Sequence, residues 1–413
     1  MTVAMERGAG GQRVATVDHY LRPGLLQLQA LPPLALYIHL PWCLQKCPYC
    51  DFNSHGLQGA TDAPPEKEYL CALLADLEAA LPLIWGRPVY SVFFGGGTPS
   101  LFSPDAIAEL LAAVRARLPL LPTCEITLEA NPGTFEQQRF AAFAQAGVTR
   151  LSVGVQSFDD TALRAIGRAH NAVQARAALE EAARCFRTFN LDLMYALPGQ
   201  TLGMLQADLA QALAFAPPHL SIYHLTIEPN TAFAVRPPRN LPDDDLAYDM
   251  LDAITRATHH TGLERYEVSA YARPGHACVH NRNYWEYGDY LGIGAGAHSK
   301  LSFPHRIVRQ VRLRDPRRYM QQALVGQALA QEHDVPHADL AFEYMLNALR
   351  LRQGFALADF TARTGLAAGS IEPALRHAEE KSWIERDLHC VRPTVRGFDF
   401  LSDLQALFLP AHA

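Results

Sequence analysis

The sequence predicts an α/β protein: a partial (β/α)6, TIM-like barrel followed by a smaller, mostly helical, winged-helix-like domain. Six short apolar runs recur in the first 228 residues, and stretches with helical character lie between them. This alternation is typical of βα units around a parallel sheet, whose strands are apolar on both faces because helices cover them. Six units are too few to close a TIM barrel, so we expect an open, incomplete one.

The strands and helices of this barrel can be placed along the chain. The apolar runs occupy residues 34–40, 89–96, 124–130, 150–156, 187–197 and 219–227. The helical stretches between them are residues 66–81, 104–118, 135–146, 159–183 and 202–215. Ser103 followed by Pro104 indicates a helix start, because serine caps the first turn and proline fits the first helical position.

Beyond the barrel the pattern changes. Residues 229–330 lose the βα rhythm and are expected to extend the barrel, with a helix near residues 245–261. Residues 331–413 predict helices and a β-wing, typical of a winged-helix module. The predicted organisation is therefore a flexible extension (1–33), the partial barrel (34–228), the extension of the barrel (229–330) and the C-terminal domain (331–413).

Composition excludes several classes of protein. Of 413 residues, 49% are hydrophobic and 19% are charged, which is enough apolar material for a large core. The 36 basic and 42 acidic residues give a formal charge of −6, so nucleic acid is a poor partner and the winged-helix module is expected to pack or act as a lid. Six arginines lie between residues 306 and 318, and a solvated face is the simplest interpretation, with a membrane-bound or acidic partner as the alternative.

Three of the eight cysteines crowd together, at positions 43, 47 and 50. The chain starts without the apolar segment of a secretory signal, so we expect a cytoplasmic protein in a reducing compartment. There, such a triplet is more typical of a metal or cluster site than of a disulfide.

The spacing CxxxCxxC, directly after the first predicted strand, places Cys43, Cys47 and Cys50 close enough to chelate one metal centre. An iron–sulfur cluster normally takes four cysteines, so three would leave one iron open for another ligand. The alternative is a structural zinc site completed by His39 or His55.

Further polar and glycine residues lie at the carboxyl ends of the predicted strands. Gly95, Gly96 and Gly97 end the second strand, where the lack of side chains would let a ligand approach backbone N–H groups. Glu129, Gln156 and Asp192 lie at or near the ends of the next three strands, on the rim that holds the active site in βα barrels.

These motifs together resemble the radical S-adenosylmethionine (SAM) superfamily. They are CxxxCxxC, GGGTPS, a strand-end glutamate and GVQSF. Within it, the chain is similar to the oxygen-independent coproporphyrinogen III oxidase family, and YIHLPWCLQKCPYCDFNSH, EITLEANPGT, LTIEPNT, HNRNYW and GDYLGIGAGAHSK resemble its heme chaperone branch. The resemblance covers about residues 34–405 and implies a [4Fe–4S] cluster, SAM and heme as ligands.

The resemblance also implies residue roles. Cys43, Cys47 and Cys50 match the cluster ligands. The residues that match the surroundings of SAM are Tyr37 and Tyr49 beside the cluster and adenine, Gly96, Gly97 and Thr98 at the amino group, and Glu129 near the ribose. The coproporphyrinogen III oxidase is a decarboxylase that binds a second SAM. The residues that match its contacts to this second SAM are Gln156, Arg168 and Asp192.

Position 52 and the HNRNYW motif favour the chaperone branch. The decarboxylase pattern has a further cysteine two residues after the third, and here that residue is Phe52. His280 of HNRNYW matches the motif associated with heme and is the expected axial ligand, with the Cys278 thiolate as its rival. His298 and His224 are weaker candidates, expected to be structural or to line the pocket.

The resulting hypothesis is a cytoplasmic heme carrier, without catalytic residues, that delivers heme to heme-requiring proteins such as respiratory enzymes, including membrane-associated ones. We expect a monomer or a cluster-dependent dimer. One alternative is a radical enzyme that acts on coproporphyrinogen III, in which SAM supplies the chemistry. Another is a structural zinc protein with a winged-helix partner module.

Overall fold

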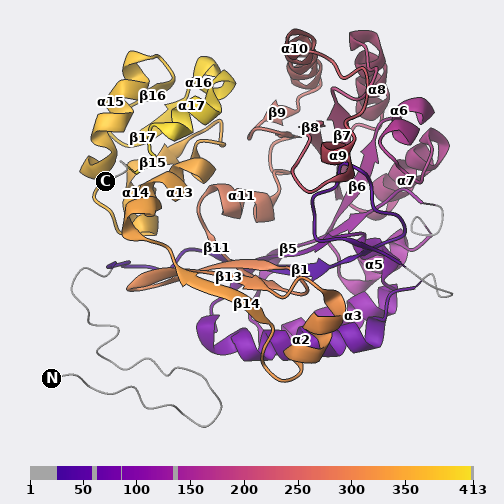
Figure 1. Cartoon of the computed structure of the whole chain (residues 1–413), viewed down its shortest axis with the longest axis horizontal. Coiled ribbons are helices and arrows are strands. Elements are labelled where there is room, and N and C mark those ends of the chain that lie inside the picture. Colours follow the sequence, from indigo (N-terminus) through magenta and orange to yellow (C-terminus); the bar gives the residue numbers. More distant parts are fainter. Residues whose placement is uncertain (1–25, 58–62, 85, 134–137, 411–413) are drawn as a thin grey trace.

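The computed structural model describes residues 26–57, 63–84, 86–133 and 138–410. Its centre is a twelve-stranded sheet, ordered β14-β13-β12-β11-β1-β4-β5-β6-β7-β8-β10-β9 (Figure 1). Six of these strands form consecutive parallel pairs: β1 (Leu34–Leu40), β4 (Val89–Gly96), β5 (Leu120–Ala130), β6 (Arg150–Gln156), β7 (Thr188–Tyr195) and β8 (His219–His224). Each coincides with one of the six predicted apolar runs, so the partial (β/α)6 barrel is confirmed.

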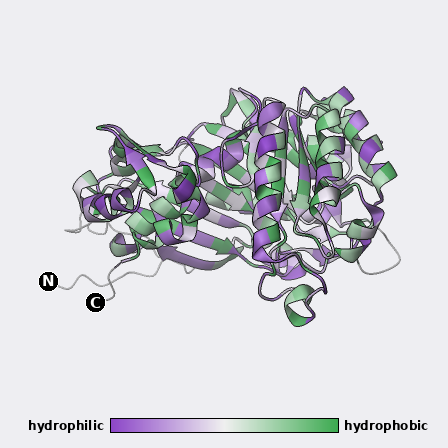
Figure 2. Ribbon diagram, turned by 90° about the horizontal axis from the view of Figure 1, so that it is seen from above, coloured by the Kyte–Doolittle hydropathy of each residue, from purple (hydrophilic) through white to green (hydrophobic). Residues whose placement is uncertain are grey.

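Helices cover the outside of this barrel and enclose the main hydrophobic core between themselves and the sheet. They are α2 (Glu66–Ile84), α3 (Pro104–Arg117), α5 (Phe140–Ala146), α6 (Asp160–Ala165), α7 (Ala172–Cys185) and α8 (Leu202–Ala214). The predicted cap of α3 is confirmed, because the Ser103 side chain accepts a hydrogen bond from the Ala106 N–H and Pro104 follows it. Figure 2 shows hydrophobic residues concentrated on the strands and on the helix faces turned toward them.

The helical stretch expected over residues 159–183 consists of two helices. The chain forms α6, leaves the helix at Gly167 with φ +71°, and starts α7 after Asn171, whose side chain makes a capping box with Gln174. A Cβ at Gly167 would lie 2.5 Å from Pro48 Cδ, so the break lets this turn pack against the loop that carries the cysteines. Arg168 lies in the break.

The segment expected to extend the barrel joins the same sheet. β11 (Asp289–Ile293) pairs parallel with β1, and β12 (His298–Phe303), β13 (Arg306–Arg312) and β14 (Leu329–Asp334) continue antiparallel. The short strands β10 (Ala270–Ala272) and β9 (Glu264–Arg265) pair at the other edge. The remaining elements of this region are α9 (Ala232–Val235), α10 (Asp244–His260), α11 (Val279–Trp285) and α12 (Pro316–Ala323).

The arginines of residues 306–318 do not form one solvated face, which corrects that interpretation. Arg312 is 2% exposed and donates from Nε to Asp76 of α2, at 2.9 Å. Arg309 donates to Glu343 at 2.7 Å. The strand β13 alternates its side chains between faces, so neighbouring arginines have different surroundings.

The C-terminal domain has its own hydrophobic core. Its helices are α13 (Leu340–Ala348), α14 (Leu357–Thr364), α15 (Glu372–Glu380), α16 (Val395–Asp399) and α17 (Leu401–Ala406), and its strands are β15 (Phe355–Ala356), β16 (Ile384–Arg386) and β17 (Cys390–Pro393). Leu26 and Leu28, from the expected flexible extension, pack on this core and are 9% and 6% exposed. The ordered chain therefore begins before residue 34, and residues 1–25 of that extension lie outside the described part. Within the described residues, no helix combines the length and apolar character needed to cross a membrane.

Candidate cofactor and ligand site

Two adjoining cavities open at the carboxyl ends of the barrel strands. We call the first the cysteine cavity, because it is lined by the three clustered cysteines; its volume is about 560 Å³. The second, of about 490 Å³, we call the aromatic cavity, after Phe52, Tyr284, Trp285, Tyr287 and Tyr290 in its lining. The residues that line both cavities are Tyr37, Asp51, Phe52, Gly96, Glu129 and Tyr284. A ligand in one cavity would therefore lie beside a ligand in the other.

The residues that the sequence matched to cluster, SAM and heme contacts lie around the cysteine cavity. They are Tyr37, Cys43, Cys47, Tyr49, Cys50, Gly96, Gly97, Thr98, Glu129, Gln156, Arg168, Asp192 and His280. Their placement on one cavity follows from the βα topology, which brings the strand ends to the same rim. Their individual roles toward a ligand remain predictions.

The cysteines lie on the short strand β2 (Trp42–Cys43), which pairs with β3 (His55–Gly56), and on the loop between these strands. All eight cysteines of the chain are free thiols. Burial, followed by the nearby Cys50, raises the pKa of the Cys43 thiol to about 11. Arg168 donates to the Cys47 sulfur at 3.7 Å.

The donor set fits an iron–sulfur cluster better than a single zinc ion. Within the described residues, no three His, Cys, Asp or Glu side chains converge as a single-ion site requires. A cubane binds each thiolate through a different iron, so it takes thiolates farther apart than one ion does. His39, a candidate fourth zinc ligand, has both ring nitrogens within hydrogen-bonding distance of other groups, the Tyr37 hydroxyl at 3.0 Å and the Asn53 carbonyl at 2.9 Å.

Gly96, which ends β4, and Gly97, which follows it, do not offer a ligand the free N–H groups expected from the sequence. The N–H groups of Gly96, Gly97 and Thr98 already donate, to the Glu129 carboxylate and to the Leu40 and Trp42 carbonyls. A Cβ at Gly97 would lie 2.4 Å from the Trp42 carbonyl oxygen, so glycine is required for the end of β4 to pack on the cysteine loop. What this segment offers a ligand is acceptors, which suit an ammonium group.

Two buried carboxyl groups face the cysteine cavity. Burial, and then Asp192, raises the pKa of Glu129 to about 8, and burial also raises the pKa of Asp192. Asn190 donates to Asp192 at 2.7 Å, and Ser152 donates to it at 3.4 Å. Glu129 can therefore hold a proton near neutral pH until a ligand supplies donors to it.

Asn131 is a cavity residue that the sequence analysis missed. It follows Glu129 in the EANPG motif, donates to the Thr98 hydroxyl at 2.7 Å and accepts from Arg168 at 2.5 Å. Arg168 also donates to the Gly154 carbonyl at 2.7 Å. Gln156 ends β6 with φ +71°, a strained backbone for a residue with a side chain. The sequence signal that could have identified Asn131 is its place in the EANPG motif.

His280 lies on α11 in the wall of the cysteine cavity, 1% exposed. Its Nδ1 is 2.9 Å from the Ser91 hydroxyl, its Nε2 is 2.9 Å from the Tyr284 hydroxyl, and its ring stacks on Phe93. Burial lowers the pKa of His280 to about 3. For His280 to ligate heme iron, one of these two hydrogen bonds would have to break, and the ligand assignment stays a prediction.

The rival ligand Cys278 is completely buried and donates to Glu125 at 3.5 Å. Burial raises the pKa of this thiol to about 12, so it is the protonated form that occupies the site at neutral pH. A protonated thiol is a poor metal ligand.

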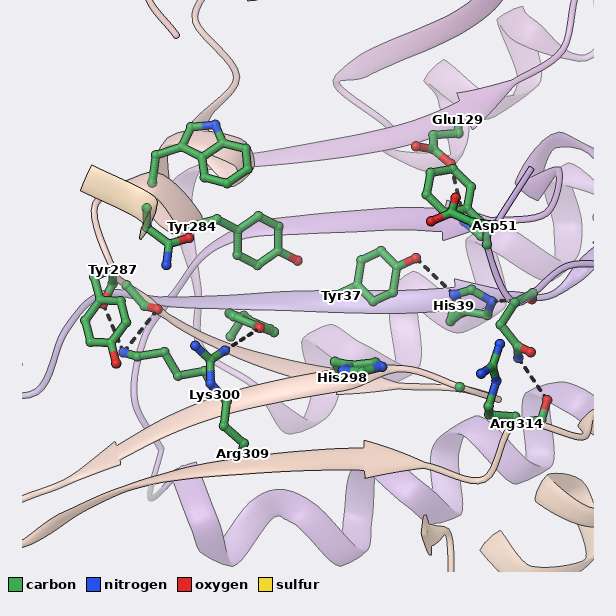
Figure 3. Close-up of a pocket in the computed structure, with 18 residues that line it drawn as sticks. Tyr37, His39, Asp51, Glu129, Tyr284, Tyr287, His298, Lys300, Arg309 and Arg314 are labelled. Atoms are coloured by element: carbon green, nitrogen blue, oxygen red, sulfur yellow. Dashed lines mark hydrogen bonds between the residues drawn. The ribbon is translucent and has the colours of Figure 1, made fainter. Parts of the chain in front are cut away.

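The aromatic cavity lies between the HNRNYW segment and the strands β12 and β13 (Figure 3). Its polar lining is basic: Lys300, Arg309 and Arg314 lie on one side, with the His298 ring between the two arginines. Sequence reasoning did not find this cavity, because its walls come from segments far apart in the chain.

Comparison with known proteins identifies the family. The "Radical SAM superfamily" model matches residues 37–212, and the "HemN C-terminal domain" model matches residues 335–400. The chain is 48% identical to "Heme chaperone HemW" of Escherichia coli, over 92% of this chain and 99% of that protein. The chain belongs to the HemW family. A HemW of Haemophilus influenzae is 45% identical over 92% of this chain and 98% of its own length.

The chain also shares its fold with a solved structure. Coproporphyrinogen III oxidase (HemN) from Escherichia coli superposes with a TM-score of 0.78 at 23% identity, covering 92% of this chain and 90% of that one. This likeness confirms the radical SAM fold with a helical C-terminal domain.

Proposed function

We propose that this protein is a heme carrier, which binds heme beside a SAM-liganded [4Fe–4S] cluster and delivers it to heme-requiring proteins such as respiratory enzymes. The support is its membership of the HemW family, whose relatives are named heme chaperones. The adjoining cavities agree with this proposal, since one offers three thiols and the other offers aromatic rings and positive charge.

The cysteine cavity would hold the cluster through Cys43, Cys47 and Cys50. A bound cluster would supply an open iron for the amino and carboxylate groups of SAM, and one-electron chemistry. The chain would orient SAM with the acceptors of Gly96–Thr98, and its buried Glu129 would accept from ribose hydroxyls. Arg168 would stabilise the negative charge of the cluster thiolates through its contact with Cys47.

The residue at position 52 is the observation that favours a heme carrier over a radical enzyme. At the position where the decarboxylase pattern has a cysteine, this chain has an aromatic side chain that is 60% exposed and lines both cavities. The exposed ring of Phe52 gives a ligand in either cavity an apolar surface to pack against. A flat porphyrin has the apolar face that would do so.

The test offers heme and coproporphyrinogen III side by side, without air, to the cluster-loaded protein with SAM and a reductant. We expect heme to bind at a fixed stoichiometry, and coproporphyrinogen III to remain unconverted when the porphyrins are separated by chromatography. Turnover of coproporphyrinogen III, or no binding of heme, would overturn the carrier. A Cys47→Ser variant is the matched control for cluster dependence.

The second candidate is a radical enzyme on the same cavity. Buried polar groups of the cysteine cavity, including Arg150, Arg168 and Asp192, offer more polar contacts than a cluster and one SAM need. The same assay separates the two functions, because only the enzyme forms a decarboxylated product.

A further inference from the structure

The aromatic cavity has the chemistry of a porphyrin site, and this inference rests on the proposed heme-carrier function. A heme is a flat apolar disc with an iron at its centre and two carboxylates on its edge. Aromatic rings pack on such faces, guanidinium groups bind such carboxylates, and an imidazole can ligate the iron. The lining contains five aromatic side chains beyond Tyr37, together with Arg309, Arg314 and His298.

The histidines around the two cavities differ in whether their ring nitrogens are free. His39 and His280 each have both nitrogens within hydrogen-bonding distance of other groups. His298 is exposed at the start of β12, and within the described residues its imidazole makes no hydrogen bond or ion pair. Burial, followed by the nearby Arg309 and Arg314, lowers the pKa of His298. A neutral imidazole is the form that ligates metals.

The backbone before His298 explains why this ring lies next to the cysteine loop. A Cβ at Gly294 would lie 2.4 Å from the His39 carbonyl, and a Cβ at Gly296 would lie 2.4 Å from the Asn53 side chain. Asn53 also donates to the carbonyls of Ala295, at 2.9 Å, and Arg314, at 2.8 Å. The glycines of GIGAGAHS thus bring His298 to the wall of the aromatic cavity, next to the loop that carries Asn53.

Positive charge lies on both sides of the His298 ring, as Figure 3 shows. Arg309 uses part of its guanidinium on Tyr290, at 2.9 Å, and Glu343, at 2.7 Å, which holds it in place. Arg314 is exposed and its side chain makes no hydrogen bond or ion pair within the described residues. Arg314 is therefore available to a carboxylate at no cost to an existing contact.

We propose that heme binds in the aromatic cavity with His298 as the axial ligand of its iron and Arg314 as a partner of a propionate. His280 then supports the wall of the cavity by holding Tyr284, and is a positioning residue. Heme in this place lies against Phe52, directly beside the cysteine loop. His224 is the remaining candidate, because it lines the cysteine cavity and its ring makes no hydrogen bond in the described part of the chain.

The test is a hemin titration of the cluster-loaded full chain, read by the position of the Soret band and by the electron paramagnetic resonance of the ferric iron. His298→Ala, His280→Ala and His224→Ala are compared, and His333→Ala, on the exposed strand β14, is the control. We expect only His298→Ala to bind hemin at least about tenfold more weakly and to lose the ligand signature of the wild type. Added imidazole restores that signature, and His298→Met replaces it with a different one.

The result that overturns the proposal is a His298→Ala protein with the spectrum and affinity of the wild type. A loss of the signature in His280→Ala or His224→Ala, with His298→Ala intact, also overturns it. If the wild-type protein binds no hemin, the proposed heme-carrier function itself fails. Equal iron content and thermal melting of the variants establish that each is folded.

A second arm tests the propionate contact. Arg314→Ala is expected to weaken the binding of hemin and to leave the binding of hemin dimethyl ester unchanged, because the ester has no carboxylate to pair. An equal loss for both compounds contradicts the proposed role of Arg314.

Discussion

Arg312 of β13 and Asp76 of α2 form a buried ion pair, and we predict that breaking it destabilises the protein and loosens the loop that carries His298. The Asp76 carboxylate accepts from Arg312 Nε at 2.9 Å and from the Tyr319 hydroxyl at 2.9 Å. It also accepts from the Gly294 N–H at 3.3 Å. Both charged side chains are almost fully buried, at 2% and 3% exposure.

The magnitude follows from this burial. Removing one partner of a buried ion pair leaves the other charge unpaired in the interior, which costs about 3–5 kcal/mol. We therefore expect Arg312→Gln to lower the free energy of unfolding by about 3 kcal/mol or more. The control is the more exposed pair between Arg306, also on β13, and Asp334 of β14, because a pair near the surface contributes only about 0–1 kcal/mol.

The assay is urea unfolding of the full chain for Arg312→Gln, Asp76→Asn, their double variant and Arg306→Gln. We expect the double variant to lose less free energy than the two single losses together, because the second change removes the charge that the first left unpaired. Hemin binding should weaken in Arg312→Gln, since Asp76 also holds Gly294. Additive losses, or an Arg312→Gln protein as stable as Arg306→Gln, would refute this reasoning.

Three further predictions concern the cysteine cavity. The raised pKa of Glu129, about 8 against 4.5, means that the folded state binds a proton that the unfolded state releases, so stability falls as the pH rises through that interval. Glu129→Gln should remove this fall, of about 5 kcal/mol at most, in urea unfolding at pH 5 and pH 8.5. Cys47→Ser should abolish cluster uptake, measured as bound iron and sulfide, whereas Cys71→Ser, at an exposed cysteine outside the cavity, should retain it. Gly97→Ala should weaken SAM binding at least about tenfold by calorimetry, because its Cβ would displace the Trp42 carbonyl, and unchanged affinity would contradict this.

The barrel and the location of the site could be predicted from local pattern. A buried strand depends on its own run of apolar residues, and a helix cap depends on a serine directly before a proline. Both signals are local, and the structure confirms the six parallel strands and the start of α3. The cysteine spacing and the strand-end residues identify one rim, because consecutive βα units have the same direction. The expected residues therefore line one cavity in the structure.

Contacts between distant segments could not be predicted in this way. The helix over residues 159–183 breaks because Gly167 packs on Pro48, which is far away in the sequence. β11 adds to the sheet next to β1, although more than 240 residues separate them. Arg312 is buried because Asp76 lies opposite it, and nothing in the arginine-rich stretch itself indicates that partner.

The sequence by itself determined the strands, the cysteine triplet and the family, since each depends on residues close together along the chain. Only the tertiary structure decided which histidine is free. His280 and His298 both lie in recognisable motifs, but Ser91 and Tyr284 occupy the nitrogens of one, whereas the other faces an aromatic cavity between two arginines. A side chain can ligate only through atoms that the fold leaves unpaired, and that pairing is a property of three-dimensional packing.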